Sequence, residues 1–136
     1  MALLDTTVLV DLGRGTRSEK CLSVRAAVRR LLAEGEMLFT SRINEAEFRV
    51  GPEISQQRQQ ELERVERVLA GIAILEFNSQ AAQRYAVIKA VMLKRGKPAG
   101  DCDTLIAAVA LANGQSVLTR NPKHFSDIAG LVVQSY

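Results

Sequence analysis

The stretch "GDCDTLIAAVALANGQSVLT", residues 100–119, decides the fold class. Its apolar run from Leu105 to Ala112 has the pattern of a buried helix, and "SVLT" then has the pattern of a short strand. A buried helix that leads directly into a strand is typical of a β-α-β unit. Asp101 and Asp103 stand at the start of this segment, where an aspartate either caps the helix or faces outward to hold a cation.

The same alternation of strand and helix patterns runs along the whole chain. Expected strands cover residues 2–4, 37–40, 71–77, 116–119 and 130–134. Expected helices cover residues 21–35, 58–71 and 79–96, besides the one that follows Asp103. This alternation predicts an α/β fold, a single three-layer domain over residues 1–136 with a parallel sheet of about five strands between helices.

The helical segments carry their own signals for faces and ends. Leu22, Ala26 and Leu31 are expected on one apolar stripe of the first long helix. Asn78 or Ser79 is expected to cap the helix that Gly96 ends.

Bulk composition excludes several classes of protein. The 136 residues are 47% hydrophobic and 24% charged, which is ordinary for a globular domain. The longest apolar run is far shorter than the ~20 residues of a membrane span, and the N-terminus lacks a signal-peptide pattern. The two cysteines predict neither a disulfide framework nor a zinc site. We therefore expect a cytoplasmic protein with no membrane partner.

Acidic residues follow the expected strands at their carboxyl ends, the edge of a parallel sheet at which active sites usually lie. Asp5 follows the first strand, Glu47 lies in "SRINEAEFRVG" after the second, and the segment before Asp103 is long enough to return to the same edge. Three carboxylates at one edge would repel each other and raise their pKa values unless a cation lay among them. Oxygen ligands without a His or Cys cluster favour Mg²⁺ or Mn²⁺ over zinc.

Each acid also has a purely structural interpretation. Asp5 fits an ordinary turn or N-cap, and Glu47 fits a capping box that Asn44 begins. Glu45 lies two residues from Glu47 and so points away from any site that Glu47 faces. His124 is expected to be a surface or half-buried structural residue rather than a proton donor.

Polar and basic residues near the same edge complete the candidate site. Asn121 follows the fourth strand, and Asp127 lies further along the same segment. The net charge of +3 favours a polyanionic partner only slightly, and the basic residues fall into three clusters that are either solvated loop charges or contacts to such a partner. These clusters are Arg14, Arg17 and Lys20; Lys94, Arg95 and Lys97; and Arg120 and Lys123.

Four motifs together resemble the PIN-domain family, and in size the VapC-like toxins of bacterial toxin–antitoxin pairs. They are "LLDTTVLVDL", "INEAEFRVG", "DTLIAAVALANGQSVLTRNPKHF" and "IAGLVV", which stand in the family's order between Leu3 and Val133. Two departures matter. Thr7 replaces an asparagine whose lost hydrogen bond would loosen Asp5, and Asn121 replaces an acid, which weakens the case for a second metal.

The resemblance implies a metal-dependent endoribonuclease. Asp5, Glu47 and Asp103 would hold Mg²⁺ or Mn²⁺, partly through waters, with Asp101 and Asn121 as further or water-mediated ligands. The residues that would contact RNA phosphates are Arg14, Arg17, Arg95, Lys97 and Arg120. A cognate antitoxin and a homodimer are implied as partners.

Three alternatives carry different sequence requirements. A dehalogenase-type phosphatase needs a second acid where Thr7 stands, and a receiver domain needs paired acids that are missing. A PIN-like module that only binds RNA or a protein stays open. Whether Asp101, Asn121 or Asp127 is the fourth ligand also stays open.

Overall fold

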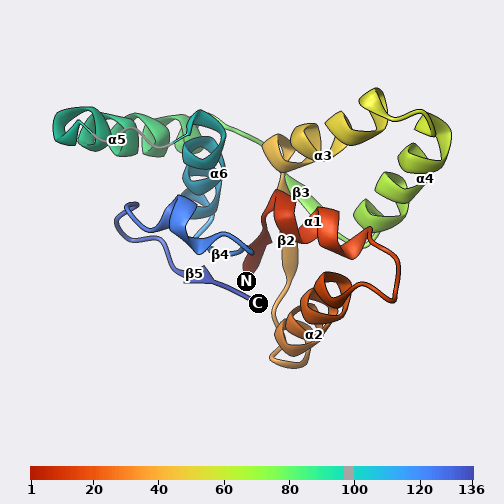
Figure 1. Ribbon diagram of the computed structural model, residues 1–136. Coiled ribbons are helices and arrows are strands. Elements are labelled where there is room, and N and C mark those ends of the chain that lie inside the picture. The colour runs from red at the N-terminus through yellow and green to blue at the C-terminus, as the bar shows by residue number, and fades with distance from the viewer. Residues whose placement is uncertain (97–99) are drawn as a thin grey trace.

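A computed structural model describes residues 1–96 and 100–136, so the expected RNA contact at Lys97 lies outside the described residues. It contains a five-stranded sheet in the order β3-β2-β1-β4-β5, in which every pairing is parallel (Figure 1). The strands are β1 (Ala2–Leu4), β2 (Leu38–Ser41), β3 (Ala73–Leu75), β4 (Ser116–Leu118) and β5 (Val133–Gln134). The predicted parallel sheet of about five strands is confirmed.

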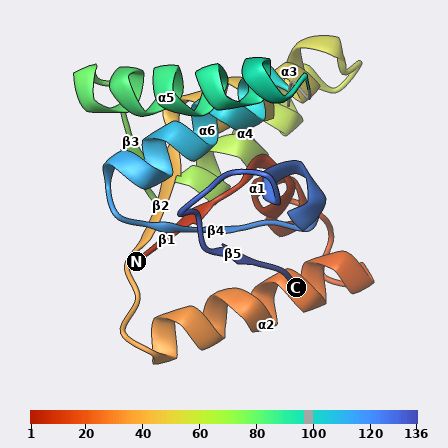
Figure 2. The same cartoon turned by 90° about the vertical axis from the view of Figure 1, so that its left-hand side faces the viewer.

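Helices cover both faces of this sheet. They are α1 (Thr6–Leu12), α2 (Glu19–Ala33), α3 (Arg42–Ile54), α4 (Arg58–Leu69), α5 (Ser79–Arg95) and α6 (Asp101–Ala112), with a short 3₁₀ helix η1 (Pro122–Phe125). Figure 2 shows α2 on one side of the strands and α5 with α6 on the other. The predicted three-layer α/β architecture is therefore confirmed.

Two apolar cores hold the layers together. Successive residues of a strand point to opposite faces, so Ala2 and Leu4 of β1 belong to the core under α1, α2 and α4, while Leu3 belongs to the core under α5 and α6. All three side chains are fully buried. Burying a Leu side chain contributes about 1.5–3 kcal/mol, so the short central strand is a substantial part of both cores.

The predicted apolar face of α2 is wrong. Leu31 is buried together with Cys21, Val24 and Ala27, but Leu22 is 57% exposed. Leu22 and Leu31 are nine residues apart, which is two and a half turns, so they lie on opposite sides of the helix. By contrast, Asn78 caps α5 through a hydrogen bond from the Ala81 amide, as expected.

The carboxyl ends of the central strands lead directly into helices. β1 runs into α1 and β2 into α3, while β4 continues through a short loop into η1. Parallel strands present these ends at one edge of the sheet, where α6 also begins. Within the residues that the structure describes, no helix is both long and apolar enough to cross a bilayer.

Candidate functional site

An open cleft of about 550 Å³ lies at this edge and collects the predicted acids. Asp5, Glu47, Asp101 and Asp103 all line it, together with Asn121. They come from the β1–α1 junction, α3, α6 and the loop after β4, so segments more than a hundred residues apart meet here. We call this cavity the acid cleft.

Asp5 occupies the N-cap position of α1, but its side chain makes no capping hydrogen bond. Its Oδ2 accepts hydrogen bonds from Thr119 Oγ1 at 2.8 Å and Thr7 Oγ1 at 3.1 Å, and its Oδ1 accepts one from Asn44 Nδ2 at 3.3 Å. The capping interpretation of its side chain is therefore wrong. The three donors are neutral, so they orient the carboxylate and leave its negative charge uncompensated.

Thr7 does not loosen Asp5. Besides its bond to Asp5, its hydroxyl accepts a hydrogen bond from the Arg120 backbone amide at 3.0 Å and lies 3.3 Å from the Thr119 hydroxyl. A hydroxyl at this position supplies the donor that an asparagine amide would supply. The expected loss of a hydrogen bond is wrong.

Glu47 is free of the capping role. Helix α3 begins at Arg42, because Ser41 accepts a hydrogen bond from the Asn44 amide at 3.2 Å while the Asn44 side chain accepts one from the Ser41 amide at 3.2 Å. Asn44 thus completes the capping box instead of starting it, and Glu47 lies in the second turn. Its Oε1 accepts a hydrogen bond from Thr6 Oγ1 at 2.6 Å.

Glu47 and Asp103 both have raised pKa values, as expected for carboxylates that lie close to one another. Burial raises the pKa of Glu47; the Thr6 hydrogen bond opposes this, and the negative charges of Asp5 and Asp103 raise it further. Burial also raises the pKa of Asp103; the contact with His124 opposes this, and Asp5 adds to it. The repulsion inferred from the sequence is present in the structure.

Asp103 lies in the first turn of α6, with Gly100 at the N-cap, whereas the sequence pattern placed it before the helix. The helix starts three residues earlier than expected, at Asp101 instead of Thr104. His124 Nδ1 lies 3.3 Å from Asp103 Oδ2 and its side chain is 54% exposed, so it is the surface residue that we expected.

Asp101 and Asn121 border the cleft in different ways. Asp101 is 73% exposed, and its Oδ1 lies 2.9 Å from Lys89 Nζ, which lowers its pKa. The backbone amide of Asn121 donates a hydrogen bond to Thr119 Oγ1 at 3.0 Å. Asp127 lies in another cavity, between α5 and the segment after η1, so its expected arrival at this rim is wrong.

The expected RNA-binding arginines are spread over the surface. Arg120 lines the acid cleft, and Arg14 lines a neighbouring cavity. Arg17 is exposed in the turn before α2. Arg95 lines the same cavity as Asp127, away from the acid cleft.

Sequence reasoning missed the residues that hold this edge together. Thr6, Thr119 and Asn44 orient the acids, and the only signal for them was that hydroxyl residues follow both β1 and β4.

Asp11 was also missed, although it is fully buried. Its carboxylate accepts hydrogen bonds from Arg120 Nη1 at 2.6 and 2.8 Å, Arg14 Nε at 2.9 Å and the Tyr136 hydroxyl at 2.7 Å. Burial and this bond to Asp11 raise the pKa of Tyr136. The cluster ties the loop after β4 to the end of α1.

The donor set of the acid cleft fits a hard divalent cation. Carboxylate oxygens from three elements face one cleft and repel one another, and they have neutral rather than cationic partners at Asp5 and Glu47. In the described ranges, 1–96 and 100–136, no three His, Cys, Asp or Glu side chains are grouped closely enough as they lie to hold an ion. An ion shared by these acids would therefore have to be held partly through bridging waters or after side-chain rotation.

Comparison with known proteins gives consistent matches over the chain. The family model of the PIN domain matches residues 2–131. The tRNA(fMet)-specific endonuclease VapC of Shigella flexneri is 29% identical over 134 residues, which cover 98% of this chain and 96% of that protein.

Solved structures match over almost the same length. VapBC2 from Rickettsia felis, bound to a DNA fragment from its promoter, superposes with a TM-score of 0.88 over 99% of this chain and 98% of that chain, and its 23% identity supports the fold alone. A toxin–antitoxin complex from Klebsiella pneumoniae superposes with a TM-score of 0.67 at 26% identity, over 97% and 96% of the two chains.

Proposed function

This chain belongs to the PIN domain family, and from that premise we propose that it is a Mg²⁺- or Mn²⁺-dependent endoribonuclease, the toxin of a toxin–antitoxin pair. The observation that carries the proposal is the meeting of Asp5, Glu47 and Asp103 at one cleft, with pKa values raised for Glu47 and Asp103. Groups with such shifts in a cleft are typical of functional sites.

Asp5, Glu47 and Asp103 are the residues that hold the metal ion in this proposal. A divalent ion held by these three carboxylates would supply Lewis-acid chemistry for water activation and would offset negative charge on the phosphate. Asp101 and Asn121 line the same cleft, where they would serve as further or water-mediated ligands.

The threonines and Asn44 give this site its rigidity. The hydrogen bonds from Thr7, Thr119 and Asn44 fix both oxygens of Asp5, and Thr6 fixes one oxygen of Glu47. Oriented ligands reduce the rearrangement that is needed during the reaction. Arg120 lies at the cleft wall, where its positive charge favours the approach of an RNA phosphate.

RNA as substrate is supported by the name of the Shigella flexneri relative, which describes an endonuclease specific for tRNA(fMet). An antitoxin partner is supported by the Klebsiella pneumoniae toxin–antitoxin complex. The homodimer and the cytoplasmic location are proposals from the family resemblance.

The test is RNA cleavage by the wild type and the Asp5→Asn variant, each with Mn²⁺ and with a chelator. We expect cleavage only by the wild type with metal, because the variant keeps the shape of the side chain and loses its charge. Cleavage that survives both the chelator and the substitution would contradict the proposal. Salt-sensitive RNA binding without any cleavage would favour the alternative, a module that only binds RNA.

A further inference from the structure

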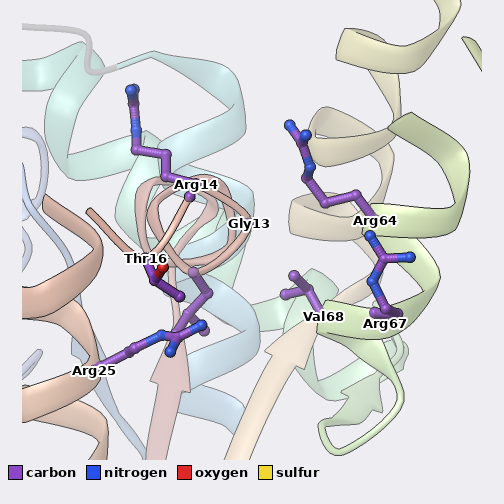
Figure 3. A pocket seen from close by; sticks show the side chains of 9 residues that line it. Gly13, Arg14, Thr16, Arg25, Arg64, Arg67 and Val68 are labelled. Atoms are coloured by element: carbon purple, nitrogen blue, oxygen red, sulfur yellow. The ribbon is translucent and has the colours of Figure 1, made fainter. Parts of the chain in front are cut away.

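A second cavity, of about 520 Å³, is lined by four arginines and by no acidic residue. Arg14 comes from the turn after α1, Arg25 from α2, and Arg64 and Arg67 from α4 (Figure 3). We call this cavity the arginine pocket. Figure 3 shows Arg14 and Arg64 extending in the same direction from opposite walls.

The arginine charges are only partly neutralised. Arg14 contacts Asp11 through Nε, which leaves its two terminal amino groups for other partners, and Arg64 lies 3.1 Å from Glu61. Arg25 and Arg67 form no salt bridge with any residue that the structure describes. Like charges gathered in one cavity attract a polyanion.

The absence of a side chain at Gly13 lets Arg64 lie close to the turn after α1. A Cβ at this position would lie 3.3 Å from Arg64 Cδ, so the aliphatic stem of Arg64 rests directly against the Gly13 backbone. Close packing between the end of α1 and α4 therefore forms this wall of the arginine pocket.

A third cavity, of about 290 Å³, joins the arginine pocket to the acid cleft. It shares Gly13, Arg14 and Arg64 with the arginine pocket, and it shares Val10 and Glu47 with the acid cleft. The three cavities thus adjoin in series along α1. One end of this groove is acidic and the other is basic.

We propose that the arginine pocket binds the phosphate backbone of the same RNA strand that the acid cleft cleaves, away from the scissile bond. The proposal rests on the proposed function of the acid cleft. Phosphates recur along an RNA strand, so a strand with one phosphate at the acids presents others along the groove. Guanidinium groups bind phosphate with paired hydrogen bonds, and the groove has no acidic residue at this end. An acidic peptide would explain the arginines but not their continuity with the acid cleft.

The test measures binding of a long, mixed-sequence single-stranded RNA by fluorescence anisotropy over a range of salt concentrations, in chelator. We expect the Arg25→Ala/Arg67→Ala double variant to bind on the order of tenfold more weakly, with a salt dependence shallower by about 1.4, since each phosphate contact contributes about 0.7 to the slope. In Mn²⁺, its KM for RNA should rise while its kcat stays unchanged.

Two matched variants make the result specific. Arg84→Ala/Lys94→Ala removes the same charge from exposed positions on α5, and we expect a much smaller loss of affinity. Arg25→Lys/Arg67→Lys keeps the charge but loses the paired hydrogen bonds, so its affinity should lie between those of the wild type and the Arg25→Ala/Arg67→Ala variant. An unchanged kcat of the Ala variant in Mn²⁺ excludes misfolding as the cause of its weaker binding.

Equal losses in the pocket and α5 variants would overturn the proposal, because they would indicate diffuse attraction. The proposal would also be overturned if the Arg25→Ala/Arg67→Ala variant bound RNA as tightly as the wild type does. This holds even if the variant bound an acidic peptide more weakly. Binding is measured without metal, so a wild type that binds RNA through the pocket but never cleaves it would refute the proposed function alone.

Discussion

Two aspartates at opposite ends of α1 are both buried and have opposite surroundings. Asp11 is neutralised by Arg14 and Arg120 and bonded to Tyr136, whereas Asp5 receives hydrogen bonds only from neutral groups. A buried carboxylate with two cationic partners is a structural ion pair. A buried carboxylate that is held by neutral donors keeps its negative charge and can bind a metal ion.

Glu45 and Glu47 repeat this contrast two residues apart on α3. Burial acts to raise the pKa of Glu45, but hydrogen bonds from Arg49 and Arg42 hold it below its ordinary value. Glu47 has only the Thr6 hydroxyl, and its pKa is raised. In these two pairs, the proposed metal ligand has only neutral hydrogen-bond partners, whereas the other acid is paired with two arginines.

The largest expected effect is a difference in RNA-cleavage activity between variants of Glu47 and Glu45. Glu47→Gln should lower kcat for RNA cleavage by about 10²–10³-fold, because it removes a charge that faces the proposed metal. Glu45→Gln should leave kcat near the wild-type value, since the buried Glu45 side chain is paired with Arg42 and Arg49 of the same helix and does not line the acid cleft. Steady-state cleavage in Mn²⁺ measures both, and similar losses in the two variants would break the contrast.

Substitutions of Asp11 and Asp5 should have different effects on the stability of the fold. Asp11→Asn should lower the free energy of unfolding by about 2–4 kcal/mol, because it leaves Arg120 and Arg14 without their buried partner. Asp5→Asn should leave it unchanged or slightly higher in metal-free buffer. Urea denaturation measures both, and a larger loss for Asp5→Asn would show that Asp5 has a structural role.

Metal binding should act on one aspartate and not on the other. Mn²⁺ at about ten times its Kd should stabilise the wild type by about 1.4 kcal/mol, because only the folded chain assembles the acids. The Asp5→Asn variant should lose this stabilisation. The Asp11→Asn variant should be stabilised by Mn²⁺ as much as the wild type is, although it is less stable without the metal. Thermal melts with and without Mn²⁺ measure the shift, and equal shifts in Asp5→Asn and the wild type would place the ion elsewhere.

The smallest effect is a pH dependence of the metal-free protein. The folded state raises the pKa of Asp103 above its ordinary 3.8, so the folded state binds the proton more tightly than the unfolded chain does. Wild-type stability should therefore fall slightly relative to Asp103→Asn as the pH rises from 3.8 through the raised pKa, and stay level above it. Urea denaturation across this pH range measures the difference. A difference that does not change with pH would contradict the raised pKa.

The sequence was sufficient for the sheet and for the meeting of the acids, because strand alternation and the position of strand ends are local patterns. It was not sufficient for the partners of Asp5, since Thr119 and Asn44 approach it only through tertiary packing. Helix starts were also missed, because Ser41 and Asn44 are both good capping residues and only the backbone geometry selects between them.

The central place of β1 has a consequence for the order of events during synthesis. β1 pairs with β4, and the hydroxyl that fixes Asp5 is contributed by a residue 114 positions downstream. The ribosome must release the chain as far as Thr119 before this strand pair and this hydrogen bond can form. The acid cleft therefore cannot assemble on the nascent chain until the ribosome has synthesised the segment that carries Thr119.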